Sequence, residues 1–331
     1  MILFSSPSTC RQGKNIIIPV LLLASFFLIG QTLFAGSEKS STVARNTNLQ
    51  HGFEKKIIIS IEEKDFSGRL LKISGLFLNL PYRGGPLGEG LRGKYDQDPL
   101  YRFDCFDCTT YVETVLALAK ARSFPEFKNL INMVRYRRGI VSYRERNHFT
   151  SLDWIANNIQ AGFTEDITRK IGGKLTRLAK CRINKYQWYQ NKKKSELRLF
   201  KARVATESLR LIKQFREEGR RFPQTGEKVE LPYILIKSFF SEMGDAKLLS
   251  SIPTGVIINI VRPDWDLRGL IGTKLLISHQ LLGIRKNDGK LYVRHASSLK
   301  KKVVEESFLK YLGKYQKSYS IKGININLIK S

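Results

Sequence analysis

The first half of the chain contains the apolar periodicity of two consecutive helices. The first is predicted to begin at Cys108 and to run to about Ala121. The second is predicted from about Phe124, with Ser123 as its cap and with an apolar face made of Phe127, Ile131 and Val134. The pattern therefore places a cysteine at the start of a helix.

The last third of the chain changes to the pattern of strands. An apolar strand is predicted at residues 255–261, and two more are predicted at 278–284 and 290–297. The last two flank Asn287-Asp288-Gly289, a strong hairpin-turn signal. Helices followed by antiparallel strands predict an α+β fold, which we expect to form one domain of residues 36–331.

The hairpin makes a register prediction for two histidines. If the loop contains three residues, Leu281 pairs with His295, and His279 lies diagonal to His295 on the same face. A two-residue loop would reverse this parity.

Residues 165–230 are predicted to form a basic, mainly helical insertion. Residues 169–221 alone contain 18 Lys or Arg and 4 Glu. The expected helix, from about Leu175 to Arg221, has an apolar stripe of Leu197, Phe200, Val204, Leu211 and Phe215. Two interpretations are open: a solvated helix with an ordinary core face, or a lobe that docks on an anionic surface.

The N-terminus has the pattern of a secretory signal peptide. Two basic residues precede the apolar run 16–30, and Leu33-Phe34-Ala35 is followed by small residues. We expect residues 1–35 to be removed after Ala35, which predicts a periplasmic or secreted protein. The alternative is an uncleaved membrane anchor.

The composition suggests the class of partner. With 42% hydrophobic residues the chain can form a core, and its net charge is +28. For an exported protein, such a charge favours anionic envelope polymers, acidic lipids or carboxylate-rich cell-wall peptide over nucleic acid. We expect a monomer that needs no metal and no organic cofactor.

Cys108 is a candidate nucleophile because of its position. The positive end of a helix stabilises a thiolate and lowers a thiol pKa from about 8.5. Asp107 is predicted to cap the helix. The backbone N–H of Cys108 is expected to stabilise an oxyanion, assisted by Tyr82 in the glycine- and proline-rich loop 76–88. The less specific interpretation is that Cys108 is a small buried residue.

Other cysteine chemistry remains open. Cys105 and Cys108 form a Cys-x-x-Cys that also suits a redox site, and the two cysteines with His279 and His295 have the residue types of a zinc site. Cys181 makes the number of exported cysteines odd. A Cys105–Cys181 disulfide would leave Cys108 free, whereas a Cys105–Cys108 disulfide would block it.

The two histidines supply what a nucleophilic cysteine needs. His279 could accept the thiol proton, and His295 could orient the ring of His279, which completes a generalised catalytic triad. The simpler interpretation of His279 is a hydrogen-bonded core histidine. His148 is expected to be structural or to line a cleft.

The motifs around these residues resemble the NlpC-type papain-like cysteine hydrolases, and more closely the branch described as N-acetylmuramoyl-L-alanine amidase-like. The element Asp107 to Glu113 is similar to that family's nucleophile motif Asp-Cys-x-Thr-x-Val-Glu, Ser278-His279 matches its base, and His295-Ala296-Ser297 matches its third member. Glu113 itself is expected to do no more than face solvent or pair with a neighbouring strand. The resemblance spans roughly residues 70–315.

The resemblance also implies a substrate cleft. Tyr82 belongs to a Pro-Tyr-x-x-Gly loop that looks like the one lining the cleft in relatives, as do Arg146-Asn147-His148-Phe149 and Asp153-Trp154. Substrate contacts are accordingly expected from Tyr82, Asp107, Arg146, Asn147, His148 and Trp154. Relatives usually have glycine two residues after the base, where this chain has Leu281, so the cleft could be narrower.

The function implied is that of an exported peptidoglycan hydrolase of papain-like fold. The branch favours cleavage of the amide between the muramic acid lactyl group and L-Ala, through a thioester. Two alternatives stay open: an endopeptidase that cuts between D-Glu and the diamino acid, and a non-catalytic, basic envelope-binding protein.

Overall fold

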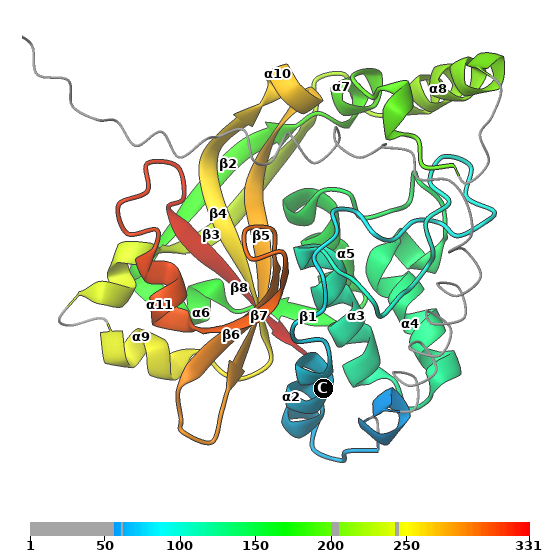
Figure 1. Cartoon of the computed structure of the whole chain (residues 1–331). Coiled ribbons are helices and arrows are strands. Elements are labelled where there is room, and N and C mark those ends of the chain that lie inside the picture. The colour runs from blue at the N-terminus through cyan, green and yellow to red at the C-terminus, as the bar shows by residue number, and fades with distance from the viewer. Residues whose placement is uncertain (1–55, 61, 200–204, 242–244) are drawn as a thin grey trace, which may run out of the picture. The chain divides into compact units, whose positions relative to one another are not determined.

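A single antiparallel sheet organises the protein. The computed structural model describes residues 56–60, 62–199, 205–241 and 245–331, and the predicted signal peptide, residues 1–35, lies outside them. The strand order is β2-β3-β8-β4-β5-β6-β7, with β1 paired to β8, and each of these pairs is antiparallel. Helices lie on both sides of this sheet (Figure 1). The α+β prediction is confirmed.

The strands are β1 (Thr164–Asp166), β2 (Thr176–Ile183), β3 (Glu227–Leu235), β4 (Val256–Leu267), β5 (Thr273–Arg285), β6 (Leu291–Ser297), β7 (Lys302–Ser307) and β8 (Gly323–Ile329). The helices are α2 (Phe66–Leu76), α3 (Cys108–Lys120), α4 (Phe124–Arg135), α5 (Ile155–Gln160), α6 (Thr168–Gly172), α7 (Lys185–Gln190), α8 (Ala205–Gly219), α9 (Asp245–Ser251), α10 (Arg268–Ile271) and α11 (Phe308–Gly313). Tighter turns are 3₁₀ at 137–139, 173–175, 194–196 and 236–240, and π-helical at Thr150–Trp154.

The central strands are buried on both faces. Neighbouring residues of β4 enter different cores: Ile257 packs in the core that contains α3 and α4, and Ile258 in the core that contains α11. This explains why, apart from Asn259, the residues 256–261 are apolar on both faces rather than alternating. Within the described residues, no helix has the length and apolar content needed to cross a membrane.

The two predicted helices are confirmed. Helix α3 begins at Cys108 and is capped by Asp107, and α4 begins at Phe124, where the Ser123 hydroxyl accepts a hydrogen bond from the N–H of Glu126. The face of α4 made of Phe127, Ile131 and Val134 is buried.

The hairpin register is also confirmed. Leu282 pairs with Arg294 and Arg285 with Leu291, the parity that a three-residue loop requires. The backbone N–H of Lys286 donates to the carbonyl of Lys290, which encloses the three turn residues, and Gly289 adopts a φ of 73°. Such a left-handed residue is where glycine closes a hairpin.

The segment of the predicted insertion contains a strand as well as helices. Residues 176–183 form β2, which pairs along its length with β3 as the edge of the main sheet. Of the predicted stripe, Leu197 precedes α8, Leu211 and Phe215 lie on it, and Phe200 and Val204 lie outside the described residues. Helix α8 itself carries three basic and three acidic residues, so the excess positive charge lies outside it. The exposed basic side chains of β2 instead sit where charges protect an edge strand from pairing with other chains.

A central strand was missed altogether. Strand β8 lies between β3 and β4, and the amides of its alternating Ile-Asn sequence are buried. Asn325 Oδ1 accepts from Asn259 Nδ2 at 2.9 Å, and Asn259 Oδ1 accepts from Gln280 Nε2 at 3.0 Å. This row of amides crosses the sheet to β5, the strand that contains His279.

Candidate active site

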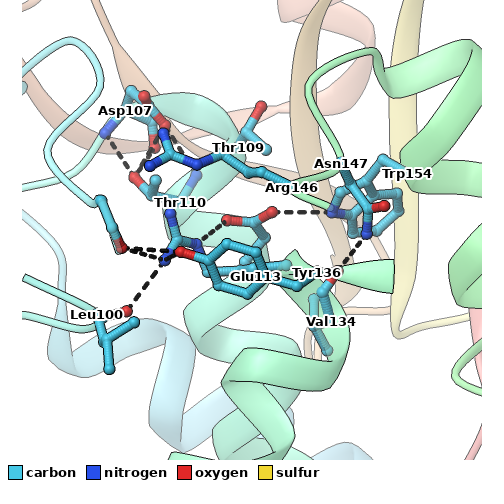
Figure 2. Close-up of polar contacts among 12 residues, drawn as sticks. Leu100, Asp107, Thr109, Thr110, Glu113, Val134, Tyr136, Arg146, Asn147 and Trp154 are labelled. Carbon is cyan, nitrogen blue, oxygen red and sulfur yellow. Dashed lines mark hydrogen bonds and ion pairs between the residues drawn. The ribbon is translucent and has the colours of Figure 1, made fainter. Parts of the chain in front are cut away.

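Cys108 occupies the first turn of α3 behind a well-formed cap. Asp107 Oδ1 accepts hydrogen bonds from the Thr110 backbone N–H and hydroxyl, both at 2.8 Å, and Thr110 Oγ1 accepts from the Asp107 N–H at 3.0 Å (Figure 2). The second carboxylate oxygen of Asp107 accepts from the Gly85 N–H at 2.9 Å. Asp107 thus fixes the start of the helix and joins it to the preceding loop.

The environment of Cys108 favours a neutral thiol. Burial and the charge of Asp107 raise the pKa of Cys108 to about 12, although a hydrogen bond from the backbone of Gln280 favours the thiolate. The expectation that the helix start would lower this pKa is therefore wrong, because loss of hydration and the charge of Asp107 outweigh the hydrogen bonds from Gln280 and Thr109 that favour the thiolate. The contact with Gln280 places the sulfur beside the residue that follows His279.

His279 and His295 come together as the register predicted. Nε2 of His279 lies 2.8 Å from Nδ1 of His295, and the two rings meet edge to face with centroids 4.9 Å apart. Burial, and then the neighbouring His295, lower the pKa of His279 well below its usual value. Burial likewise lowers the pKa of His295 to about 4. Both rings are therefore neutral at pH 7.

Two neighbours of His295 were not found from the sequence. Glu306 on β7 places Oε1 3.4 Å from His295 Nε2, and Tyr311 on α11 packs edge-on against the His295 ring at 5.1 Å. The pairing of His295 with Val304 brings Glu306 near, and that register depends on a turn with no strong sequence signal.

Tyr82 belongs to the same region. Its backbone N–H donates to the Lys301 carbonyl at 2.9 Å, and it forms a parallel bridge with Phe106, two residues before Cys108. Burial, Asp107 and Cys108 raise the pKa of the Tyr82 phenol, which therefore stays neutral and keeps its donor proton. The predicted proximity of Tyr82 to Cys108 is thus present.

Arg146 and His148 make contacts with the loops that lie near α3. Arg146 is largely buried and forms ion pairs with Glu89 and with Asp96, the latter at 3.0 Å, from the loop that follows Tyr82. His148 Nε2 donates to the Tyr143 carbonyl at 2.7 Å, and burial and Arg146 lower its pKa well below the usual value. His148 also lines a cavity of about 230 Å³ with Asn147 and Asp153.

Trp154 and Asn147 differ in what they can offer a substrate. Trp154 is fully buried, and its Nε1 donates to Glu113 Oε1 at 3.0 Å; Asn147 Nδ2 donates to the Val134 carbonyl at 3.0 Å (Figure 2). Full burial contradicts the predicted substrate contact of Trp154, whereas Asn147 also lines the cavity of about 230 Å³, and its substrate contact stays a prediction.

The expectation for Glu113 was wrong. Its carboxylate is buried and accepts from Arg135 Nε at 3.2 Å as well as from Trp154. Burial raises the pKa of Glu113 to about 7, while Arg135 lowers it. The available sequence signal for this buried role was a glutamate in the middle of a mainly apolar helix. A helix that is buried all round has no solvated side on which the glutamate could lie.

The other cysteine interpretations lose support. Cys105, Cys108 and Cys181 are all free thiols. Across the described ranges, no three His, Cys, Asp or Glu residues are grouped as metal ligands would be, which contradicts the alternative zinc site. Burial raises the pKa of Cys105 and takes that of Cys181 to about 11.

The departure at Leu281 has a packing explanation. Its side chain is fully buried with Ile258 and Val293 in the core beside α11. It therefore fills interior space and does not narrow a cleft.

Comparison with known proteins places this architecture in a family. Residues 72–321 match the profile of the family described as N-acetylmuramoyl-L-alanine amidase-like. The chain belongs to this family. The matched residues include the capped helix α3 and the two strands that contain His279 and His295. No curated protein sequence matched the chain.

Solved structures share the fold. A crystal structure of a Legionella pneumophila protein is 38% identical, with a TM-score of 0.81 over 87% of this chain and 97% of that one. An N-acetylmuramoyl-L-alanine amidase from Bacteroides uniformis shares the fold at 23% identity and a TM-score of 0.53, over 79% of this chain and 97% of that one. A Bacteroides fragilis structure titled as a putative xylanase shares it similarly, at 23% identity and a TM-score of 0.52, over 77% of this chain and 99% of that one.

Proposed function

We propose that the protein is an exported cysteine amidohydrolase of papain-like type that cleaves the amide between the N-acetylmuramoyl lactyl group and L-Ala. The observation that carries the proposal is the hydrogen bond of 2.8 Å between His279 on β5 and His295 on β6. The backbone of Gln280, the residue after His279, contacts the Cys108 sulfur. Family membership supplies the substrate class.

Acylation begins from a neutral thiol and a neutral imidazole. His279 accepts the proton of Cys108 as the sulfur bonds to the lactyl carbonyl carbon, so the charge separation develops only during attack. The Cys108 backbone N–H and the neutral Tyr82 phenol are the proposed donors to the oxyanion. When the C–N bond breaks, His279 returns the proton to the nitrogen of L-Ala.

Deacylation reverses the roles. His279 takes a proton from a water molecule as the water oxygen attacks the thioester carbonyl. His279 then gives that proton to the departing sulfur, which regenerates the thiol of Cys108. The products are a muramoyl carboxylate and a peptide with a free N-terminal L-Ala.

The non-catalytic alternative has less support. Helix α8, the longest helix of its docking lobe, has no net charge, whereas a binding protein would not need a hydrogen-bonded imidazole pair. Export remains part of the proposal on the N-terminal pattern alone, and attachment to an anionic envelope would have to use basic residues outside α8.

Product mass tests the proposal. The purified protein is incubated under reducing conditions with a disaccharide-tetrapeptide muropeptide, and the products are identified by mass spectrometry. We expect a free disaccharide and an intact tetrapeptide, and no products from Cys108→Ala. Cys105→Ala is the matched control and should remain active. Release of a disaccharide-dipeptide would instead identify the endopeptidase, and an inactive wild type would refute the hydrolase.

A further inference from the structure

The hydrogen-bonded row that begins at His279 continues beyond His295. On β7, Glu306 is 8% exposed and places Oε1 3.4 Å from His295 Nε2. Its other oxygen, Oε2, contacts the ammonium group of Lys314 and lies 3.4 Å from that of Lys300. The carboxylate is thus held between one imidazole and two cations.

Glu306 is ionised at neutral pH. Burial alone would favour the neutral acid, but Lys314, the hydrogen bond from His295 and the charge of Lys300 bring the pKa of Glu306 below its usual value. An ionised carboxylate accepts hydrogen bonds and has no proton to donate.

This acceptor determines where each ring proton lies. Nε2 of His295 faces the carboxylate, so it carries the proton, and Nδ1 of the neutral ring is left as an acceptor. Nε2 of His279 faces that acceptor at 2.8 Å and must donate to it. The lone pair of His279 is then on Nδ1.

We propose that Glu306 is a positioning residue that selects, through His295, the tautomer in which His279 Nδ1 is free to accept a proton. The kinetic consequence rests on the proposed function, because only in a cysteine hydrolase does that nitrogen act as the base for Cys108. The tautomer itself requires no substrate.

Glu306→Gln is the informative variant. Lys314 and Lys300 can only donate, so they orient the amide oxygen of the glutamine toward themselves and turn its NH₂ group toward His295. Nε2 of His295 must then become an acceptor, the proton moves to Nδ1, and His279 has to present its own Nε2 lone pair to it. Both rings are expected to change from the Nε2–H to the Nδ1–H tautomer.

Tautomers are read from long-range proton–nitrogen spectra of the full protein labelled with ¹⁵N-histidine. The wild type should show His279 and His295 as Nε2–H, and Glu306→Gln should show both as Nδ1–H. The matched control is Glu305→Gln on the same strand, whose carboxylate pairs with Lys286 and Arg294. It should keep the wild-type tautomers. A wild-type His295 protonated on Nδ1 would overturn the proposal without any variant, as would unchanged tautomers in Glu306→Gln.

Kinetics on the muropeptide complete the test. Glu306→Gln should lower kcat by at least about tenfold with little change in KM. The loss should not exceed the roughly 10²- to 10⁴-fold that general base catalysis contributes. An unchanged kcat together with switched tautomers would refute the catalytic importance of Glu306. If the wild type cleaves nothing, the hydrolase proposal fails, while the spectra still decide whether Glu306 sets the tautomers.

Discussion

At the residue scale, the neutral state of Cys108 is the feature with the clearest consequence. A papain-like ion pair would hold a thiolate across neutral pH, but burial and Asp107 put the thiol pKa at about 12. Under the proposed mechanism, the nucleophilicity of Cys108 before substrate binding is therefore low, and activation is deferred to the attack itself. A neutral thiol is also protected from adventitious oxidants, which react with thiolates.

Alkylation of Cys108 by iodoacetamide should depend steeply on pH. Because the thiol pKa is raised, the thiolate fraction grows by about tenfold for each pH unit from 7 to 10. The rate is followed by mass spectrometry of the peptide that contains Cys108.

Asp107→Asn provides the comparison for this experiment. It keeps an acceptor oxygen for the cap and removes the charge that raises the thiol pKa, so Cys108 should be alkylated faster than in the wild type at pH 8. A wild-type rate that is flat from pH 6 to 8 would contradict the neutral thiol and indicate a preformed ion pair.

Local patterns predicted some site residues and missed others for physical reasons. His279 and His295 were predictable because a short hairpin converts sequence spacing directly into cross-strand pairing. Glu306 was not, since its position follows from the register of a third strand. The thiol pKa of Cys108 was predicted in the wrong direction because a sequence does not show how deeply an atom is buried.

At the element scale, α3 depends on its cap. Asp107→Ala removes the acceptor for two donors of Thr110 and the bond to Gly85, and should lower the free energy of unfolding by about 1 kcal/mol. Urea denaturation measures the change. Asp107→Asn should lose less, and equal losses in both variants would mean that charge and not capping matters.

The elements show where periodicity is informative. In α3 and α4 the apolar face and the cap residue indicate the same helix: both helices begin at the predicted residue, and α3 ends within one residue of its predicted end. Strand β2 was taken for a helix because it is an edge strand with basic side chains toward solvent, which removes the alternation expected of a half-buried strand. The Asn residues of β8 suggest a solvated face, but the amides bond to one another instead.

At the scale of the whole molecule, α8 supports the loop that follows Tyr82. Phe215 of α8 is fully buried, stacks on Tyr189 at 4.5 Å and meets Tyr95 edge-on at 5.0 Å. Arg198, in the segment before α8, forms an ion pair of 2.9 Å with Asp98, which belongs to the loop that follows Tyr82. The segment for which a solvated helix and a docking lobe were both open therefore packs against the loop of residues 83–98.

Phe215→Ala should loosen the packing of the loop of residues 83–98. Loss of a buried phenylalanine costs about 3–5 kcal/mol, and because α8 packs in a satellite core the loss should be local. Amide hydrogen exchange should accelerate in residues 83–98 and remain unchanged in α3. Leu209→Ala, on an exposed side of the same helix, is the control. Faster exchange throughout the protein would show that α8 does not act on the loop alone.

The position of β8 in the sheet has a consequence for folding. Residues 323–329 form the strand between β3 and β4, and the groups proposed to act on substrate range from Tyr82 through Cys108 to His279, with His295 and Glu306 positioning the base. Contacts so distant in sequence form late, after the intervening chain has been ordered. Without β8 the strands β3 and β4 have no partner between them, so the proposed site should form only after residues 323–329 have joined the sheet.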